Sequence, residues 1–156
     1  MNQFLGRQLS MTSKAFRAEF DARLSEVGGS LSTWIVLRSA EESAGTWGLS
    51  QKELAERMGV EGPTLVRHLD RLEREGLIQR CVDARDRRVT RIAVTPAGSR
   101  VFDNLRHVAD AMDEEVRSLL GSSDYDVVLE VLDRLQKHMT RLAGERKANA
   151  QAAQGV

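Results

Sequence analysis

Residues 50–94, SQKELAERMGVEGPTLVRHLDRLEREGLIQRCVDARDRRVTRIAV, decide the fold. They open with a capping box, in which the hydroxyl of Ser50 and the carboxylate of Glu53 satisfy the first free N–H groups of a helix. Gly59 ends this short helix, and Pro63 stands where the first turn of another helix tolerates a missing N–H. Two short helices joined by a tight turn are therefore predicted.

The second short helix has one apolar side. At 100° per residue, Leu65, Leu69 and Leu72 fall within about 60° of one another and form the predicted buried face. His68 lies on the flank of this face. The residues expected to point outward are Pro63, Thr64, Arg67, Asp70, Arg71 and Arg74.

A β-hairpin is predicted directly after this helix. Gly76 closes the helix, and 77–82 and 89–94 are β-prone runs joined by a loop that holds three arginines and two aspartates. Such a tip suits a wing that inserts arginine into the negative minor groove of DNA. Arg88 is the candidate for that contact, and Asp86 is placed to accept from its guanidinium and hold it extended. The alternative is a loop that only solubilises the hairpin.

Helix, turn, helix and hairpin in this order predict a winged helix-turn-helix within a mainly α fold that carries a small β-wing. Arg67 is the best base-reading candidate, because a guanidinium donates two hydrogen bonds to guanine. The alternative is that the outward charges only solvate a helix surface. The residues expected to contact DNA are Ser50, Gln51, Pro63, Thr64, Arg67, His68, Arg71, Asp86, Arg87 and Arg88.

Long amphipathic helices flank this region. Residues 5–26 carry apolar side chains four or seven positions apart, from Leu5 to Leu24, and predict the first of them. Gly28 and Gly29 end it, and Ser30 or Ser32 caps a second helix that runs to about residue 44.

Two more helices follow the hairpin. Thr95 and Pro96 begin a helix that runs to about Leu120, and the last helix carries its apolar stripe from Val127 to Leu142. After Ala143 this stripe disappears, so residues 144–156 are expected to be frayed or disordered.

Composition limits the classes of protein. The 156 residues hold 23 basic and 23 acidic side chains, 4% aromatics and two prolines, which favours helices over a β-sandwich. The single Cys81 has no partner for an intramolecular disulfide, and no apolar run approaches the roughly 20 residues that a membrane span needs. With no signal peptide at the N-terminus, a cytoplasmic protein is expected.

The segment from Val60 to Ile78, VEGPTLVRHLDRLEREGLI, followed by Asp86-Arg87-Arg88, resembles the MarR family of bacterial transcription regulators, especially its SlyA-like members. The resemblance extends over nearly the whole chain up to Ala143. It implies a regulator, most simply a repressor, that binds a palindromic operator in double-stranded DNA.

The resemblance also implies a homodimer. A single MarR-type domain is expected over 1–143, with dimerisation helices at 5–30 and 97–143 and a DNA-binding lobe at 31–96. The length of the apolar stripes supports this independently, because a monomer would leave a large apolar patch in water. The alternative is a compact monomeric bundle.

Members of this family often bind aromatic carboxylates such as salicylate, which implies an effector site here. An aromatic ring would stack on Trp34 while a cation pairs with the carboxylate. The matching positions are Lys14, Arg17, Ser32, Trp34, Arg38 and His68. The open alternatives are that Trp34 belongs to the core, that the cations are ordinary surface charges, and that the regulator needs no ligand.

No catalytic or cofactor site is predicted. His68, His107 and His138 lack the spacing of a metal site, and Cys81 is expected to be an ordinary strand residue. No nucleophile with a base and no phosphate-binding loop is present. Two rival functions therefore lack support in the sequence: an enzyme acting on an aromatic acid, and an oligomerisation module, which would not need an arginine-tipped hairpin.

Overall fold

The computed structural model describes residues 4–43, 49–58, 60, 62–83, 86–87 and 89–154. The chain divides into two compact units, Met1–Ala111 and Met112–Val156. This division differs from the single domain over 1–143 expected from the sequence, and that domain assignment stays a prediction.

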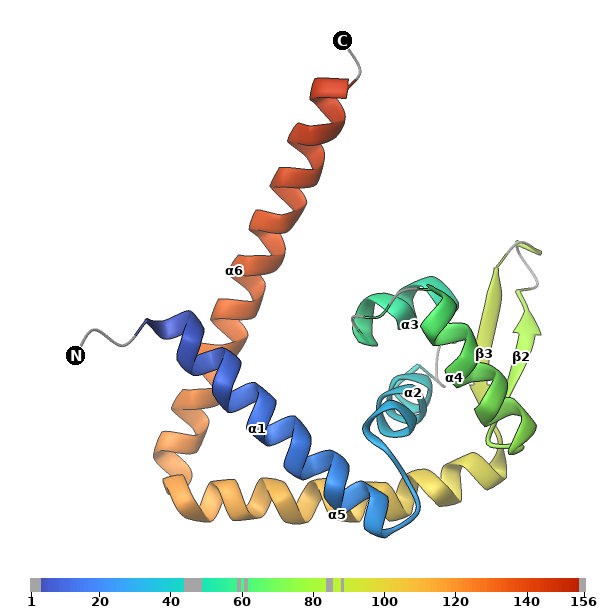
Figure 1. Ribbon diagram of the computed structural model, residues 1–156, viewed down its shortest axis with the longest axis horizontal. Helices are drawn as coiled ribbons and strands as arrows, with labels where there is room; N and C mark the ends of the chain where they lie inside the picture. Colours follow the sequence, from blue (N-terminus) through green and yellow to red (C-terminus); the bar gives the residue numbers. More distant parts are fainter. Residues whose placement is uncertain are drawn as a thin grey trace. The chain divides into compact units, whose positions relative to one another are not determined.

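The structure is mainly helical with one small antiparallel sheet, which confirms the predicted fold class (Figure 1). Figure 1 shows α2 and α4 beside the β2–β3 hairpin. The elements are α1 Leu5–Glu26, α2 Leu31–Glu41, β1 Leu49–Ser50, α3 Gln51–Met58, α4 Gly62–Arg74, β2 Ile78–Val82, β3 Thr90–Val94, α5 Pro96–Leu120 and α6 Ser122–Gln154.

The sheet has three strands in the order β1-β3-β2. Strands β2 and β3 form the predicted hairpin, with Ile78 opposite Val94 and Val82 opposite Thr90. Strand β1 pairs with the other edge of β3. Strand β1 has only two residues and so has no periodicity by which it could be predicted from the sequence.

Side-chain caps begin the helices where the sequence places them. The Ser50 hydroxyl accepts from the Glu53 N–H at 3.2 Å, and a carboxylate oxygen of Glu53 accepts from the Ser50 N–H at 2.8 Å, which confirms the capping box. Ser30 caps α2 by accepting from the Thr33 N–H. Thr95 caps α5, where its hydroxyl accepts from the Gly98 N–H.

The core of the first unit is built from leucines and one aromatic cluster. Trp34 stacks on Phe102 with ring centroids 5.2 Å apart and meets the edge of Phe20 at 5.8 Å. The side chains that are less than 2% exposed include Leu24, Leu37, Leu54, Leu69, Leu72 and Ile92. This core fixes α4 and the hairpin, which carry the predicted DNA contacts.

The second unit contains the end of α5 and all of α6. Between these helices Gly121 adopts a positive φ of 78°. Close to this turn the Tyr125 hydroxyl donates to Asp113, and the Arg117 guanidinium lies 4.0 Å from the Tyr125 ring centroid. None of the described helices is long and apolar enough to cross a lipid bilayer.

Helix α6 continues to Gln154, where the sequence predicted disorder after Ala143. The prediction relied on the loss of the apolar stripe. Alanine, arginine, lysine and glutamine are nevertheless strong helix formers, and an Arg141–Glu145 ion pair of 2.7 Å spans one turn beyond the stripe. Helix propensity therefore explains why α6 continues beyond Ala143 without a buried face.

We expect Gly98→Ala to lower the free energy of unfolding by about 2 kcal/mol, because overpacking a tight contact strains the backbone. A Cβ at Gly98 would collide with the Leu77 carbonyl oxygen and lie 2.7 Å from Val94 Cγ1. Gly144→Ala on α6 is the matched control, since its Cβ would meet nothing within 4 Å. Urea unfolding measures both variants, and equal midpoints would contradict the predicted collision.

Candidate nucleic-acid interface

Helix α4 separates an apolar side from a charged side. Leu65, Leu69 and Leu72 are at most 2% exposed, as the sequence predicted. At 100° per residue, Arg67 and Arg74 stand opposite these leucines, and both are exposed. In the part of the chain that the structure describes, neither guanidinium has an ion-pair or hydrogen-bond partner. Both can therefore donate to an external acceptor.

One flank of α4 is held by Arg80 of β2. Its Nη1 lies 2.7 Å from Asp70 Oδ1 and 2.8 Å from Glu73 Oε2, and its backbone N–H donates to Glu73 Oε1 at 3.0 Å. Arg80 belongs to the same hairpin as the arginines of the wing loop. The structure instead directs it to α4, because two carboxylates of the helix lie one turn apart beside the strand.

The other flank of α4 is held by Arg71. Its Nη2 donates to Thr33 Oγ1 of α2 at 2.9 Å, and its Nη1 lies 3.4 Å from Glu75 Oε1. Arg71 was predicted to contact DNA, but this geometry already engages its guanidinium within the protein.

The base of the wing is tied to α3 by a chain of charged groups. The buried carboxylate of Asp83 accepts from Arg91 Nε at 2.7 Å, and Arg91 Nη1 lies 3.6 Å from Glu53 Oε2. Two donors from Ser50, its hydroxyl first and its backbone N–H second, hold the pKa of Glu53 below the ordinary 4.5, and Arg91 adds to this effect. The pairing of β1 with β3 also places Ser50 opposite Arg91.

Part of the wing tip is described. The Asp86 N–H donates to Asp83 Oδ1 at 3.2 Å, which closes the turn. Asp86 and Arg87 are both exposed. Arg88, the predicted minor-groove residue, lies outside the described residues, and so does its predicted contact with Asp86.

The other predicted DNA contacts lie at the starts of the two short helices and on α4. Ser50 and Gln51 open α3, and Ser50 is occupied by the cap. Pro63 and Thr64 are exposed in the first turn of α4. His68 is half-buried on the α4 flank that also carries Arg71. The structure thus gathers these residues on α3 and α4.

Two of the predicted effector residues, Trp34 and Arg38, lie at the aromatic cluster. Trp34 is 7% exposed, so most of its surface is already covered by Phe20 and Phe102. The Arg38 guanidinium lies 5.7 Å from the Trp34 ring centroid, and its Nε lies 2.8 Å from Glu42 Oε1. Trp34 therefore serves the core whether or not a ligand also reaches it.

The remaining effector candidates lie on α1, α2 and α4. Lys14 and Arg17 are exposed on α1, and no described carboxylate pairs with either. Ser32 is half-buried in the first turn of α2, where its hydroxyl lies 3.0 Å from Ser30 Oγ.

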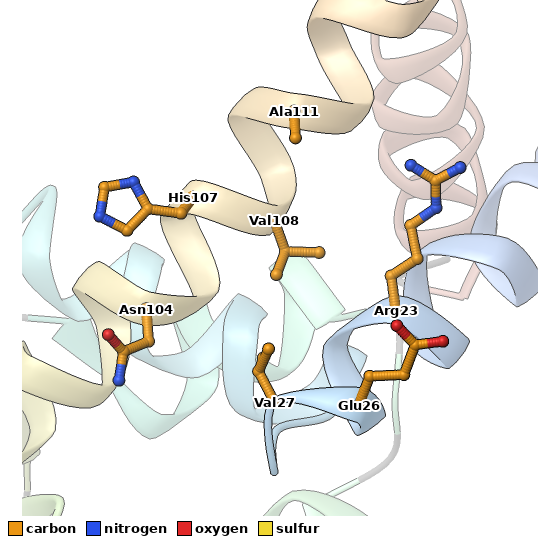
Figure 2. Close-up of a pocket in the computed structure, with 7 residues that line it drawn as sticks. All are labelled: Arg23, Glu26, Val27, Asn104, His107, Val108 and Ala111. Atoms are coloured by element: carbon orange, nitrogen blue, oxygen red, sulfur yellow. The ribbon is translucent and has the colours of Figure 1, made fainter.

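The sequence did not single out a groove of about 480 Å³ between α1 and α5 (Figure 2). Val27 and Val108 contribute apolar surface to it, and Arg23, Glu26 and His107 contribute charged or titratable groups. Its residues come from two distant segments, so no local motif reveals it. The groove is open, and Arg23 is paired with Glu19 at 2.8 Å.

Across the described ranges, no three His, Cys, Asp or Glu side chains form a group suited to hold a metal ion. Cys81 is exposed on β2.

Comparison with known proteins matches a model of the MarR family to residues 28–89. The solved structure of the transcriptional regulator PA3341 is 36% identical, with 88% of this chain and 99% of that chain covered and a TM-score of 0.77. CouR from Rhodococcus jostii RHA1, bound to p-coumaroyl-CoA, is 30% identical with 85% and 89% covered and a TM-score of 0.73.

A third structure, the S. aureus MepR–DNA complex, is 23% identical, with 87% of this chain and 96% of that chain covered and a TM-score of 0.73. At this identity it supports the fold alone.

We expect Glu53→Gln to lower the free energy of unfolding by about 0.5 kcal/mol near pH 7, because the amide keeps the cap acceptor but loses the charge. The folded pKa of Glu53 is depressed, so the carboxylate contributes stability above about pH 4.5 that is lost as the pH falls further. The difference from wild type should therefore shrink as the pH falls below 4.5 through the folded pKa of Glu53. Urea unfolding across this range measures it.

Glu56→Gln is the matched control, since Glu56 lies exposed on the same helix. Its difference from wild type should stay close to zero at every pH. A Glu53→Gln difference that did not depend on pH would refute the charged cap.

Proposed function

Because the chain belongs to the MarR family of DNA-binding transcription regulators, not enzymes, we propose that it represses transcription by binding a palindromic operator through α4 and the wing. One observation carries the proposal. The α4 face opposite the buried leucines presents Arg67 and Arg74, and no described group of the protein pairs with them.

Arg67 is the proposed base-reading residue. Its planar guanidinium matches the O6 and N7 acceptors of guanine in the major groove, where α4 is the right size to enter. Pro63 and Thr64 are exposed one turn earlier and would approach the neighbouring bases or phosphates. Arg74, about two turns further along the helix, is suited to a phosphate.

The wing is proposed to contact the adjacent minor groove through Arg87 and Arg88. Arg87 is exposed, whereas Arg91 and Arg80 of the wing strands form ion pairs with Asp83 and Asp70 within the protein. A narrow minor groove has an enhanced negative potential that attracts such side chains. MepR, which has the same fold, was solved in complex with DNA.

We further propose that the protein acts as a homodimer. Helix α1 exposes Leu5, Met11 and Phe16 to between 45% and 58%. Helix α6 exposes five neighbouring aliphatic residues, Val127, Val128, Leu129, Val131 and Leu132, each to more than 40%. Apolar faces of this length mark interaction surfaces, and a second copy would cover them.

A two-fold dimer presents two α4 helices and would match two half-sites about one helical turn apart, roughly 34–36 Å. A ligand that favours a different separation of the two helices would release the operator. The symmetry of the protein would then appear as a palindrome in the DNA.

The proposed effector is a small aromatic carboxylate. Lys14 and Arg17 are exposed cations on the helix that carries Phe16 and Phe20, next to Trp34. A ring would meet aromatic surface while a cation pairs with the carboxylate. CouR was solved with p-coumaroyl-CoA, whose acyl group is also aromatic.

We expect Arg67→Ala to weaken binding about 10- to 100-fold to a duplex that the wild-type protein enriches from a randomised pool, because one bidentate base contact is lost. The loss should disappear for duplexes changed at the single base pair that Arg67 reads. Fluorescence anisotropy over a salt series measures both effects.

Arg134→Ala is the matched control, since Arg134 is an exposed arginine on α6 without a described partner. It should bind as the wild type does. If the folded wild-type protein enriches no duplex, or if Arg67→Ala binds equally well, the proposed DNA face is wrong.

We expect 4-hydroxybenzoate or salicylate to quench tryptophan fluorescence with saturation and to release the enriched duplex over the same concentrations. Arg17→Gln should lower the affinity for the ligand about tenfold without changing the affinity for the duplex, because it removes a charged hydrogen-bond donor. Trp34→Phe leaves Trp47 as the remaining tryptophan, so quenching that is lost in this variant comes from Trp34. A linear, unsaturable response would argue against this effector class.

A further inference from the structure

The Arg71 guanidinium lies at the meeting point of α4 and α2. Its Nη2 donates to Thr33 Oγ1 at 2.9 Å, and the two residues are 38 positions apart in the sequence. Among the described residues, this is the side-chain hydrogen bond that joins α4 to α2. Thr33 is 3% exposed, so a duplex cannot reach it. The atom that Arg71 holds is thus inside the protein.

Thr33 is itself fixed by the start of α2. Its Oγ1 lies 2.9 Å from Ser30 Oγ, and the same Ser30 oxygen accepts from the Thr33 N–H at 3.2 Å. The neighbouring Leu31 N–H donates to Asp21 Oδ1 of α1 at 2.7 Å. The acceptor for Arg71 is therefore anchored to two helices, α1 and α2.

Chemistry fixes the first donor in this series of hydrogen bonds. A guanidinium only donates, so Thr33 Oγ1 accepts from Arg71 and can pass its own hydrogen to Ser30 Oγ. Ser30 can in turn donate to Ser32 Oγ at 3.0 Å. Hydrogen bonds aligned in one direction polarise and strengthen one another. Arg71 therefore joins the polar network at the start of α2.

The position of Arg71 around α4 agrees with an internal role. It stands about 40° from Arg67 toward the flank that faces α2, and its Nη1 also lies 3.4 Å from Glu75 Oε1. Arg80 holds the opposite flank from β2. The two arginines together restrain rotation of α4 about its own axis. The apolar contacts of the leucines resist this rotation less well, because they have no preferred direction.

We propose that Arg71 is a positioning residue, which sets the rotation of α4 through its hydrogen bond to Thr33 and so aims Arg67 at the DNA. This assignment rests on the proposed function, since it presumes that α4 reads DNA. It replaces the direct DNA contact expected for Arg71. A small rotation of α4 would move the Arg67 guanidinium away from the DNA base that it is proposed to read. The loss of this contact would weaken binding to the operator.

The test uses Thr33→Val, which removes Oγ1 and keeps nearly the same shape, with Thr33→Ser as the conservative rescue. On the duplex enriched by the wild-type protein, Thr33→Val should bind about tenfold more weakly, with an unchanged slope of log affinity against log salt concentration. Thr33→Ser should bind within about twofold of the wild type. Equal binding by Thr33→Val and wild type would overturn the proposal.

Arg71→Gln keeps the test decisive if Thr33→Val does not fold, since Arg71 lies on the surface. If Arg71 only positions α4, Arg71→Gln should keep the wild-type slope of log affinity against log salt concentration. If Arg71 contacts a phosphate, the substitution should lower this slope by about one. In the double variant, Thr33→Val should add nothing to Arg71→Gln, while additive losses would refute the coupling. Arg74→Gln is the matched control, and its slope should fall. If the wild type enriches no duplex, the proposed function fails instead.

Discussion

The burial of Leu65, Leu69 and Leu72 on one side of α4 is the constraint on which the proposed interface depends. A helix of 13 residues that buries one face must turn its opposite face to solvent, so these leucines decide which residues are outward. The leucines determine the depth of α4 in the fold. They determine its rotation less well, because aliphatic contacts have no direction.

Directional contacts supply what the leucines lack. Arg80 reaches two carboxylates on one flank of α4, and Arg71 reaches a buried hydroxyl on the other. Each bond has a defined geometry, so the pair restrains the helix from both sides. The Asp83–Arg91–Glu53 chain does the same for the wing and α3. Polar contacts thus align the elements that the apolar core brings together.

Local chemistry explains what could be predicted from the sequence. The Ser50 cap, the end of α4 before Gly76 and the Thr95 cap each involve residues within a few positions of one another, and the structure has all three. The Arg71–Thr33 bond spans 38 residues, and no pattern in one sequence pairs them. The extent of α6 was missed for another reason, because periodicity detects buried faces and not helix propensity.

The same internal bonds decide how the protein uses its charge. With 23 basic and 23 acidic side chains, the chain as a whole does not attract a polyanion. Pairing Arg71, Arg80 and Arg91 within the fold withdraws cations that would otherwise bind any phosphate backbone. Two arginines are left outward on α4: Arg67, which we propose reads a base, and Arg74, which is suited to a phosphate. Such a surface relies on fit to a particular sequence more than on long-range attraction, which suits a regulator that must find one operator among many competing sites.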